Sequence, residues 1–306
     1  MTSSLALLLC TLDRPTLAAR AVHDVLNQGC SVLSEVIVVD QSGDADAHKL
    51  AAQLYALGDS RIRLFRAKRA GLPRARNVAL DLASADQVVF VDDDVRLLPG
   101  FLDAHHHQLL QDRVGVVSGR IVERHARPNH SRTCNRVGRD GRVHTNLAGL
   151  TSTDVQVAKG ANMSFRRELL VLSGGFDARY GGSSLLEDAD ASARVRGRGW
   201  RVRFAADAEL VHLSALTGGV RLDRVQQTAW WRFHNTALFV MSQYGAARTL
   251  RAQVTFAAIA SKCAIQWREP GAFGRLMTAW GQGVAAGKSA RLGYESGDAS
   301  RYGRRA

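Results

Sequence analysis

The first 120 residues alternate short apolar runs with longer segments of helical pattern. Runs rich in β-branched residues predict strands, and the segments between them predict helices. Alternating strands and helices imply parallel pairing with right-handed crossovers, so we expect an open, doubly wound, mainly parallel α/β sheet. The predicted strands are residues 5–10, 35–39, 61–65, 87–91 and 114–117, and the predicted helices are residues 16–28, 45–57, 73–83 and 100–111.

The pattern changes after the fifth predicted strand. Residues 120–157 are polar with scattered glycines, and we expect a long loop over the ligand site there. Further strands are expected at 162–165, 200–204 and 209–213, with helices at 167–173 and 186–198. These elements complete a catalytic domain that we place at residues 1–220.

A C-terminal helical extension is expected over residues 221–306. An apolar stripe of helical period opens it, formed by Leu222, Val225, Ala229, Phe233, Ala237, Val240 and Tyr244. Two further helices are predicted at 248–267 and 272–286, and residues 289–306 are expected to be loose because they contain little apolar content.

The strands of the predicted sheet end in polar residues. Ligands of such sheets bind beyond the carboxyl ends of the strands, which here lead into residues 11–15 and 40–43 and into Asp92, Asp93 and Asp94. Carboxylates this close repel one another unless a cation or a proton joins them. Asp92 and Asp94 project to the same side of an extended segment, so both can address one ligand. Hard oxygen ligands suit Mg²⁺ or Mn²⁺, cations that also bind diphosphate oxygens.

Charge and hydropathy limit the location and the partners. No apolar run reaches the roughly 18 to 20 residues of a membrane-spanning helix, and no signal peptide is recognisable at the start, so we expect a cytoplasmic protein. From Arg248 to the end there are ten Lys or Arg and three acidic residues. Such a segment favours anionic partners and could hold the protein peripherally on the inner face of the cell membrane; the alternative is a solvated basic face.

In order over about two hundred residues, the chain resembles the family 2 glycosyltransferases of GT-A fold. The resemblance is carried by residues 9–15, 35–43, 71–77, 90–94, 160–167, 174–177 and 187–190, followed by Gly199-Trp200 and Val211-His212. It implies an inverting, metal-dependent transferase of hexosyltransferase type. This enzyme would move a sugar from a nucleotide diphosphate donor to a hydroxyl of a glycan or lipid-linked glycan, in cell-surface polysaccharide synthesis.

The same resemblance implies residue roles. Asp188 would be the general base, and Asp94 and His212 would bind Mn²⁺ or Mg²⁺, or His212 would contact the diphosphate. Asp40 would accept a hydrogen bond from the nucleotide base, and Asp92 would approach the ribose. The remaining expected donor-binding residues are Thr11, Arg14, Arg76 and Asp93, and the acceptor region is expected near Asn162, Glu187 and Trp200.

The chemistry of sugar transfer requires residues of these types, whether or not the family resemblance is considered. A hydroxyl is a poor nucleophile near neutral pH, so a carboxylate must take its proton as it attacks. A metal stabilises the departing diphosphate, and a single displacement inverts the sugar carbon. The sequence departs from the family pattern at Cys10, Leu12 and Gln41, which leaves the contact with the base open.

Two rival functions remain open. A sugar nucleotidyltransferase could use a similar sheet, but it should carry a glycine-rich basic loop after the first strand, and residues 11–14 contain no glycine. A nucleic-acid-binding protein is suggested by the isoelectric point near 10.4. Its aromatic residues should interleave with basic ones, whereas those of the C-terminal segment are sparse, so no nucleic-acid partner is expected.

Overall fold

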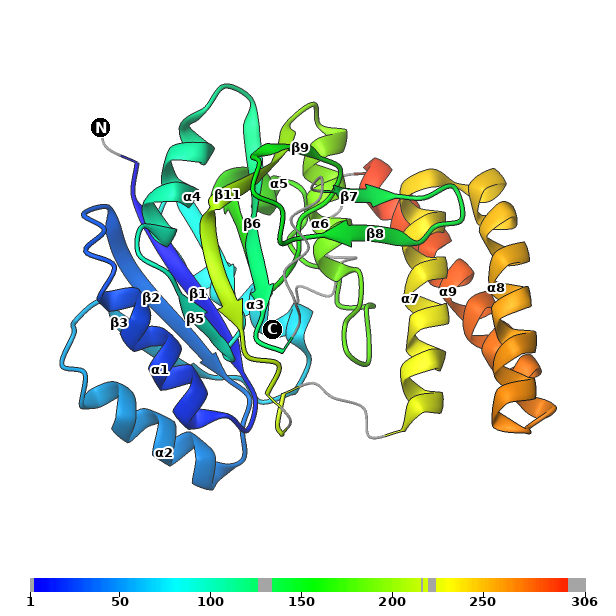
Figure 1. Ribbon diagram of the computed structural model, residues 1–306, viewed down its shortest axis with the longest axis horizontal. Helices are drawn as coiled ribbons and strands as arrows, with labels where there is room; N and C mark the ends of the chain where they lie inside the picture. Colours follow the sequence, from blue (N-terminus) through cyan, green and yellow to red (C-terminus); the bar gives the residue numbers. More distant parts are fainter. Residues whose placement is uncertain (1–2, 126–133, 216, 220–223, 297–306) are drawn as a thin grey trace.

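A central sheet with helices on both faces organises the chain (Figure 1). The computed structural model describes residues 3–125, 134–215, 217–219 and 224–296. Within these residues the sheet has nine strands in the order β3-β2-β1-β4-β10-β6-β11-β5, and β9 pairs with β11. A bundle of C-terminal helices lies beside it.

The N-terminal part confirms the predicted alternation. Strands β1 (Leu5–Thr11), β2 (Leu33–Asp40), β3 (Ile62–Arg66) and β4 (Gln87–Val91) pair in parallel, and they alternate with helices α1 (Pro15–Leu26), α2 (Asp44–Tyr55) and α3 (Leu72–Leu82). Every residue of β1 is buried. Alternate side chains of a strand face opposite sides of a sheet. Accordingly Leu7 packs in the core with α1 and α2, whereas Leu8 packs in the core with α3.

Both parallel and antiparallel pairs build the second half of the sheet. After β5 (Val95–Leu97) and α4 (Phe101–Leu110) come β6 (Val114–Glu123), β10 (Asn162–Arg166), α5 (Arg167–Leu172), α6 (Glu187–Gly197) and β11 (Arg201–His212). Strand β10 runs antiparallel between β4 and β6, and β11 runs parallel to β6. The two strands expected at 200–204 and 209–213 are one strand with an irregularity between Ala205 and Glu209. The extra residues loop out without ending the pairing.

The prediction of a long loop at residues 120–157 is largely wrong. Strand β6 continues to Glu123, β7 (Cys134–Val137) and β8 (Val143–Asn146) form a hairpin, and β9 (Thr153–Val155) joins the sheet. These strands are short, and β8 and β9 are partly exposed, so they lack the apolar runs that identify buried strands. Residues 126–133 lie outside the described part of the chain.

Three helices make up the C-terminal bundle: α7 (Val225–Tyr244), α8 (Ala246–Trp267) and α9 (Gly271–Ser296). Of the predicted stripe, Phe233, Ala237 and Val240 are buried, Val225 is exposed, and Leu222 lies outside the described residues. A side chain at Gly283 would collide with the carbonyl oxygen of His234, so this glycine lets α9 approach α7 closely.

The expectation of a loose segment from residue 289 is wrong as far as residue 296. Helix α9 continues to Ser296, and Ala290 is fully buried; residues 297–306 lie outside the description. Phe233 and Phe256 share a core cluster with Leu186 and Ala189 of the catalytic part. The boundary at residue 220 stays a prediction. Among the described residues, no helix has both the length and the apolar character needed to cross a membrane.

Candidate functional site

The aspartate run lies beyond the carboxyl ends of β1 and β4, at the edge where sequence analysis placed the ligand. Asp92, Asp93 and Asp94 follow β4, Thr11 ends β1, and Arg14 follows it. The antiparallel pairing of β5 with β11 sets His212 opposite Val95, the residue after Asp94. The topology of the sheet therefore brings His212 to the aspartates.

Asp92, Asp94 and His212 form a possible metal site. Each offers one ligand atom, and these atoms lie within 4.8 Å of one another. Nε2 of His212 lies 3.2 Å from Oδ1 of Asp94, and Nδ1 lies 3.0 Å from Oε2 of Glu123. The donor set of two carboxylates and an imidazole suits a divalent cation of the Mn²⁺ type.

The charges of this group are strongly coupled. Burial opposes ionisation of Asp94, but hydrogen bonds from His212 and Ala215 and the charge of Arg14 lower the pKa of Asp94 to about 2. The hydrogen bond to Asp94 outweighs partial burial and raises the pKa of His212 to about 9, with a further contribution from Glu123. His212 is therefore a cation at neutral pH, and its positive charge lies where a metal would contribute one.

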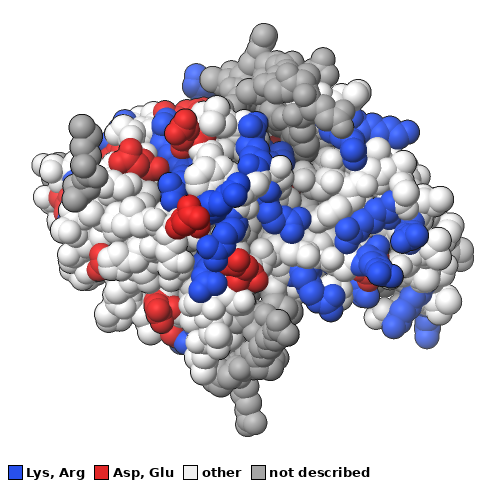
Figure 2. All heavy atoms as spheres, turned by 90° about the horizontal axis from the view of Figure 1, so that it is seen from above, with Lys and Arg blue, Asp and Glu red and all other residues white. Residues whose placement is uncertain are grey.

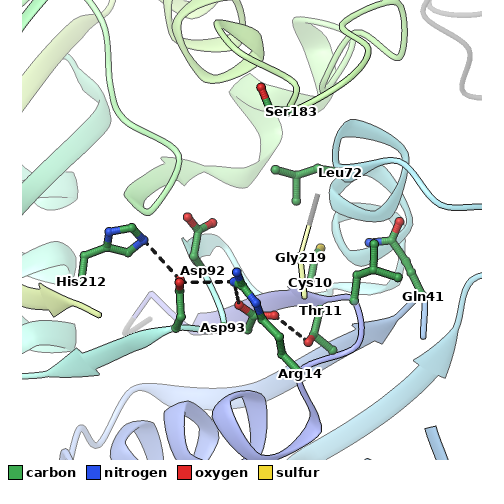
Figure 3. Close-up of a pocket in the computed structure, with 12 residues that line it drawn as sticks. Cys10, Thr11, Arg14, Gln41, Leu72, Asp92, Asp93, Ser183, His212 and Gly219 are labelled. Atoms are coloured by element: carbon green, nitrogen blue, oxygen red, sulfur yellow. Dashed lines mark hydrogen bonds and ion pairs between the residues drawn. The ribbon is translucent and has the colours of Figure 1, made fainter. Parts of the chain in front are cut away.

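Arg14 contacts two of the three aspartates (Figure 3) and also holds the segment after β11. Its Nη1 lies 2.9 Å from Oδ1 of Asp93 and 3.2 Å from Oδ2 of Asp94, and its Nε donates to the carbonyl of Thr217. Thr11 donates a hydrogen bond of 2.7 Å to Asp93. Burial raises the pKa of Asp93 to about 6, although Thr11 and Arg14 act in the opposite direction. Arg14 thus connects the start of α1 with the metal group.

A first cavity of about 200 Å³ opens over these side chains. Its walls include the predicted donor residues Thr11, Arg14, Asp92 and Asp93 and the predicted metal residues Asp94 and His212 (Figure 3). Gln41, Leu72 and Ser183 also line it, although no individual role was predicted for Leu72 or Ser183. We refer to this space as the donor cavity.

Asp40 lies behind the donor cavity and is fully buried. Its Oδ1 accepts a hydrogen bond of 2.9 Å from the backbone N–H of Ser42. Its Oδ2 is buried without a hydrogen-bond partner among the described residues. The next residue, Gln41, lines the cavity and accepts a hydrogen bond from the N–H of Gly71. A free acceptor atom behind the wall is compatible with the predicted contact to a nucleotide base, which stays a prediction.

Arg76, on α3, connects the donor cavity with the start of α6. Its Nη2 lies 3.2 Å from Oδ1 of Asp92 and 3.0 Å from the carbonyl oxygen of Gly160, and its Nη1 contacts Glu187. Although burial disfavours its charge, Glu187 and Asp92 raise the pKa of Arg76. Burial raises the pKa of Glu187 to about 8, against the effect of Arg76. Arg76 therefore stays cationic and fixes both carboxylates.

Asp188 lies beside this network at the first turn of α6. Its Oδ2 accepts a hydrogen bond of 2.7 Å from the N–H of Gly160 and lies 3.2 Å from Nζ of Lys159. Burial would raise its pKa, but Lys159, the Gly160 hydrogen bond and Arg76 lower it overall. Asp188 is thus ionised at neutral pH. Together with Lys159 it lines a second cavity of about 370 Å³, on the side of the C-terminal helices.

Two of the residues expected in the acceptor region, Asn162 and Trp200, line neither of the two cavities. Asn162 is fully buried and donates hydrogen bonds to the carbonyls of Arg120 and Ala208, where it stabilises the irregular part of β11. Trp200 precedes β11 and packs under Arg166, about 35 Å along the strand from His212. The sequence shows that both residues belong to the family motifs. It does not show in which direction their side chains point.

The structure also adds residues that the sequence reasoning missed. Lys159 directly precedes the motif at residues 160–167. Its position next to that motif is the sequence feature that could have identified it as a site residue. His105, on α4, is fully buried between Asn162 and Ser164. Burial lowers the pKa of His105 to about 4, so it stays neutral and supports the sheet.

Comparisons with known proteins agree with this geometry. Residues 7–172 match the family model described as glycosyl transferase family 2. The chain is 30% identical over 174 residues to the uncharacterized protein MT1568 of Mycobacterium tuberculosis, and the match covers 51% of each chain. It is 32% identical over 100 residues to polypeptide N-acetylgalactosaminyltransferase 4 of Mus musculus, covering 32% of this chain and 17% of the mouse protein. The chain thus spans about half or less of the curated relatives that it matches.

Two solved structures share the fold. GalNAc-T7, determined with UDP, GalNAc and Mn²⁺, superposes with a TM-score of 0.64 at 14% identity, over 79% of this chain and 48% of its own. The mannosyltransferase PcManGT from Pyrobaculum calidifontis, in complex with GDP-Man and Mn²⁺, gives a TM-score of 0.55 at 18% identity, over 95% of this chain and 88% of its own. At these identities the likeness establishes the GT-A fold. Since the family match extends over more than half of the sequence, the chain belongs to glycosyl transferase family 2.

Proposed function

We propose that this protein transfers a sugar, of the hexose type, from a nucleoside diphosphate donor to an acceptor hydroxyl, with inversion at the sugar carbon. The observation that carries the proposal is the convergence of Asp92, Asp94 and His212 in a cavity beyond the strand ends. A bound divalent cation would neutralise the charge that gathers on the departing diphosphate. The related structures with Mn²⁺ and a uridine or guanosine nucleotide support this assignment of the cavity.

The residues around the donor cavity would hold the nucleotide and the metal. Asp94, Asp92 and His212 would supply ligands, after His212 loses the proton that it shares with Asp94. Arg14 would remain beside the diphosphate as a fixed cation, because its contacts with Thr217 and Asp93 hold its guanidinium in place. The unpaired oxygen of Asp40 would accept a hydrogen bond from the base.

Asp188 is our proposed general base. Its lowered pKa keeps it a carboxylate at neutral pH, and it lines the second cavity, from which a hydroxyl could approach. Oδ1 accepts one hydrogen bond, from the N–H of Ala189, and a carboxylate oxygen can accept another. Glu187 is the poorer candidate, since burial raises its pKa to about 8 and it lines neither cavity. A single displacement assisted by Asp188 would invert the anomeric centre.

The acceptor is proposed to be a glycan or a lipid-linked glycan in cell-surface polysaccharide synthesis, with the protein on the cytoplasmic face of the membrane. Helix α8 supports contact with an anionic bilayer. Leu250, Val254 and Ile265 are exposed and lie within roughly 60° of one another around the helix, and Arg251 and Lys262 follow on the same side.

Charge also favours such a contact. Residues 224–268 contain six Lys or Arg and no acidic residue. Basic side chains are prominent over the helical end of the face drawn in Figure 2, whereas acidic ones gather toward the sheet. An exposed apolar stripe beside basic residues is typical of helices that lie in the membrane interface.

The test is thermal stability with nucleoside diphosphates. We expect UDP or GDP to raise the melting temperature in Mn²⁺ and to lose that effect in excess chelator, because a ligand that binds the folded state stabilises it by about 2.7 kcal/mol at one hundred times its Kd. Turnover with the matching nucleotide sugars and the anomeric configuration of the product then test transfer and inversion. A melting temperature unaffected by every nucleoside diphosphate in Mn²⁺ would refute the proposal.

A further inference from the structure

The cavity beside Asp188 is formed jointly by the catalytic part and the helical extension. Its walls come from the β7–β8 hairpin, the start of α6 and the facing sides of α7 and α8. It shares no lining residue with the donor cavity. We call it the helical cavity.

Its charge is predominantly positive. Three cations line it: Arg142 from the hairpin, Lys159 before β10, and Arg232 from α7, with Asp188 as the lining carboxylate. Arg142 pairs with Asp140 and Lys159 pairs with Asp188. Arg232 forms no ion pair with any residue that the structure describes. One cation is thus available to a ligand.

Another part of the lining is apolar. Phe256 and Ile259 lie one turn apart on α8, and Leu185 and Leu186 contribute from the loop before α6. Phe256 is nearly fully buried in the core shared by the two parts of the chain. A neutral, fully hydrated glycan would leave this wall without a partner, whereas an apolar group would be removed from water against it.

These walls are held in place by specific contacts. Arg248 at the start of α8 donates hydrogen bonds of 3.1 and 2.7 Å to the carbonyls of Val137 and Gly138 in the hairpin. Gly141 adopts a positive φ of 78°, and a side chain there would meet Val240 of α7. The hairpin is therefore fastened to both helices, and the helical cavity is a property of the fold.

Contacts also connect this cavity with the donor cavity. The peptide of Gly160 donates its N–H to Asp188 and accepts a hydrogen bond at its carbonyl from Arg76, which contacts Asp92. Asp188 and Asp92 thus belong to one network, with one cavity on each side. A ligand beside Asp188 is thereby linked, through Gly160 and Arg76, to the carboxylate of Asp92 in the donor cavity.

We infer that the helical cavity binds the acceptor, and that this acceptor carries an anionic group next to an apolar group. The inference rests on the proposed function, because it takes Asp188 as the base. The anion would pair with Arg232, the apolar group would pack on Ile259 and Phe256, and the hydroxyl would reach Asp188. A carboxylate and a phosphate both satisfy this chemistry.

Direct binding tests the inference without turnover. Octyl β-glucuronide carries both groups, octyl β-glucoside lacks the charge, and methyl β-glucuronide lacks the alkyl chain. We expect calorimetry, with each amphiphile below its micelle concentration, to give octyl glucuronide at least ~10-fold tighter binding than octyl glucoside, since a charge-assisted hydrogen bond contributes that much. It should also bind at least ~10-fold more tightly than methyl glucuronide, because burial contributes about 0.8 kcal/mol for each CH₂ group. Octyl phosphate is the second arm: whichever of the two anions binds more tightly identifies the preferred group. Equal binding of octyl glucoside and both anionic octyl compounds would overturn the inference.

Two variants test whether the preferences for the anionic group and for the alkyl chain arise in the helical cavity. Arg232→Gln should reduce octyl glucuronide binding to the level of octyl glucoside. Ile259→Gln should weaken binding of all three octyl compounds and leave methyl glucuronide unchanged. Lys288→Gln and Leu292→Gln alter exposed residues of α9 outside the cavity and should change nothing. Circular dichroism of each variant establishes that it is folded. Undiminished charge preference in Arg232→Gln would contradict the assignment.

The outcome is separable from that of the proposed function. Nucleotide binding in Mn²⁺ with no preference for the charged amphiphile would overturn the acceptor class and leave the transferase proposal standing. Preference for the charged amphiphile without nucleotide binding would leave a binding site for an anionic, apolar ligand and remove the transfer reaction.

Discussion

Nε2 of His212 lies 3.2 Å from Oδ1 of Asp94, because β11 runs antiparallel to β5 and sets His212 beside the aspartate run. In the absence of a metal ion, a proton on His212 occupies the position where the proposed site would bind the cation. A bound divalent cation would displace that proton and replace its charge next to Asp94. The predictions below test the groups around this pair.

Asp94→Ala should abolish Mn²⁺-dependent nucleotide binding and lower turnover by at least ~10²-fold, the usual effect of removing one stabilising group at the developing charge. Asp94 is buried and accepts hydrogen bonds from His212 and Ala215, so a loss of about 1 to 3 kcal/mol of stability is also expected. Titration with UDP and GDP measures the first effect and thermal melting the second. Asp154→Ala, a carboxylate outside both cavities, is the control. Full turnover in excess chelator would contradict the metal requirement.

Asp188→Asn should reduce turnover by about 10² to 10⁴, the range for loss of a general base. The amide oxygen can still accept the N–H of Gly160, and Asp40, Asp92 and Asp94 are unchanged, so donor binding should persist. Steady-state kinetics with separate donor titration measures both effects.

Glu187→Gln and Asp190→Asn are the comparison variants for Asp188→Asn. Glu187→Gln should weaken donor binding, because Arg76 loses its partner beside Asp92. Asp190 binds Arg194 and Gln243 within the core, so its exchange should mainly lower stability. An active Asp188→Asn together with an inactive Glu187→Gln would mean that Glu187 is the base.

Sedimentation with vesicles should depend on anionic lipid and decline as salt rises, because exposed charges are screened. The double variant Arg251→Gln, Lys262→Gln should weaken this binding by ~10-fold or more, at about 1 kcal/mol for each basic residue near the surface. Tyr55→Ser, at an exposed residue of α2 on the catalytic part, is the control. Equal binding to neutral vesicles at high salt would indicate hydrophobic docking instead.

Stability should fall as the pH drops from about 6.5 to about 4, in part through His105. Burial lowers the pKa of His105 to about 4, so between these values the unfolded chain binds a proton that the folded chain excludes. This group contributes up to ~1.4 kcal/mol per pH unit in that window and nothing above it. Urea unfolding across the window measures the slope. His105→Asn should flatten it; an identical slope in the variant would show that other groups cause the decline.

The sequence alone predicted the N-terminal half of the fold closely. The fully apolar β1 and the buried runs before Asp40 and Asp92 identify parallel strands, since both faces of such strands are covered. Sequence order then predicted the polar edge with Thr11 and Arg14. These features are local, because strand, turn and helix patterns are set by neighbouring residues.

What the sequence determined is therefore the order of elements and the identity of the aspartate run and its neighbours. The tertiary structure decided which side chains meet. It placed Asn162 in the core and Trp200 at the far end of β11, and it enclosed Asp188 in a cavity with Arg232 and Ile259. The physical reason is that such contacts depend on strand pairing and on helix packing between distant segments, whose register no local pattern encodes.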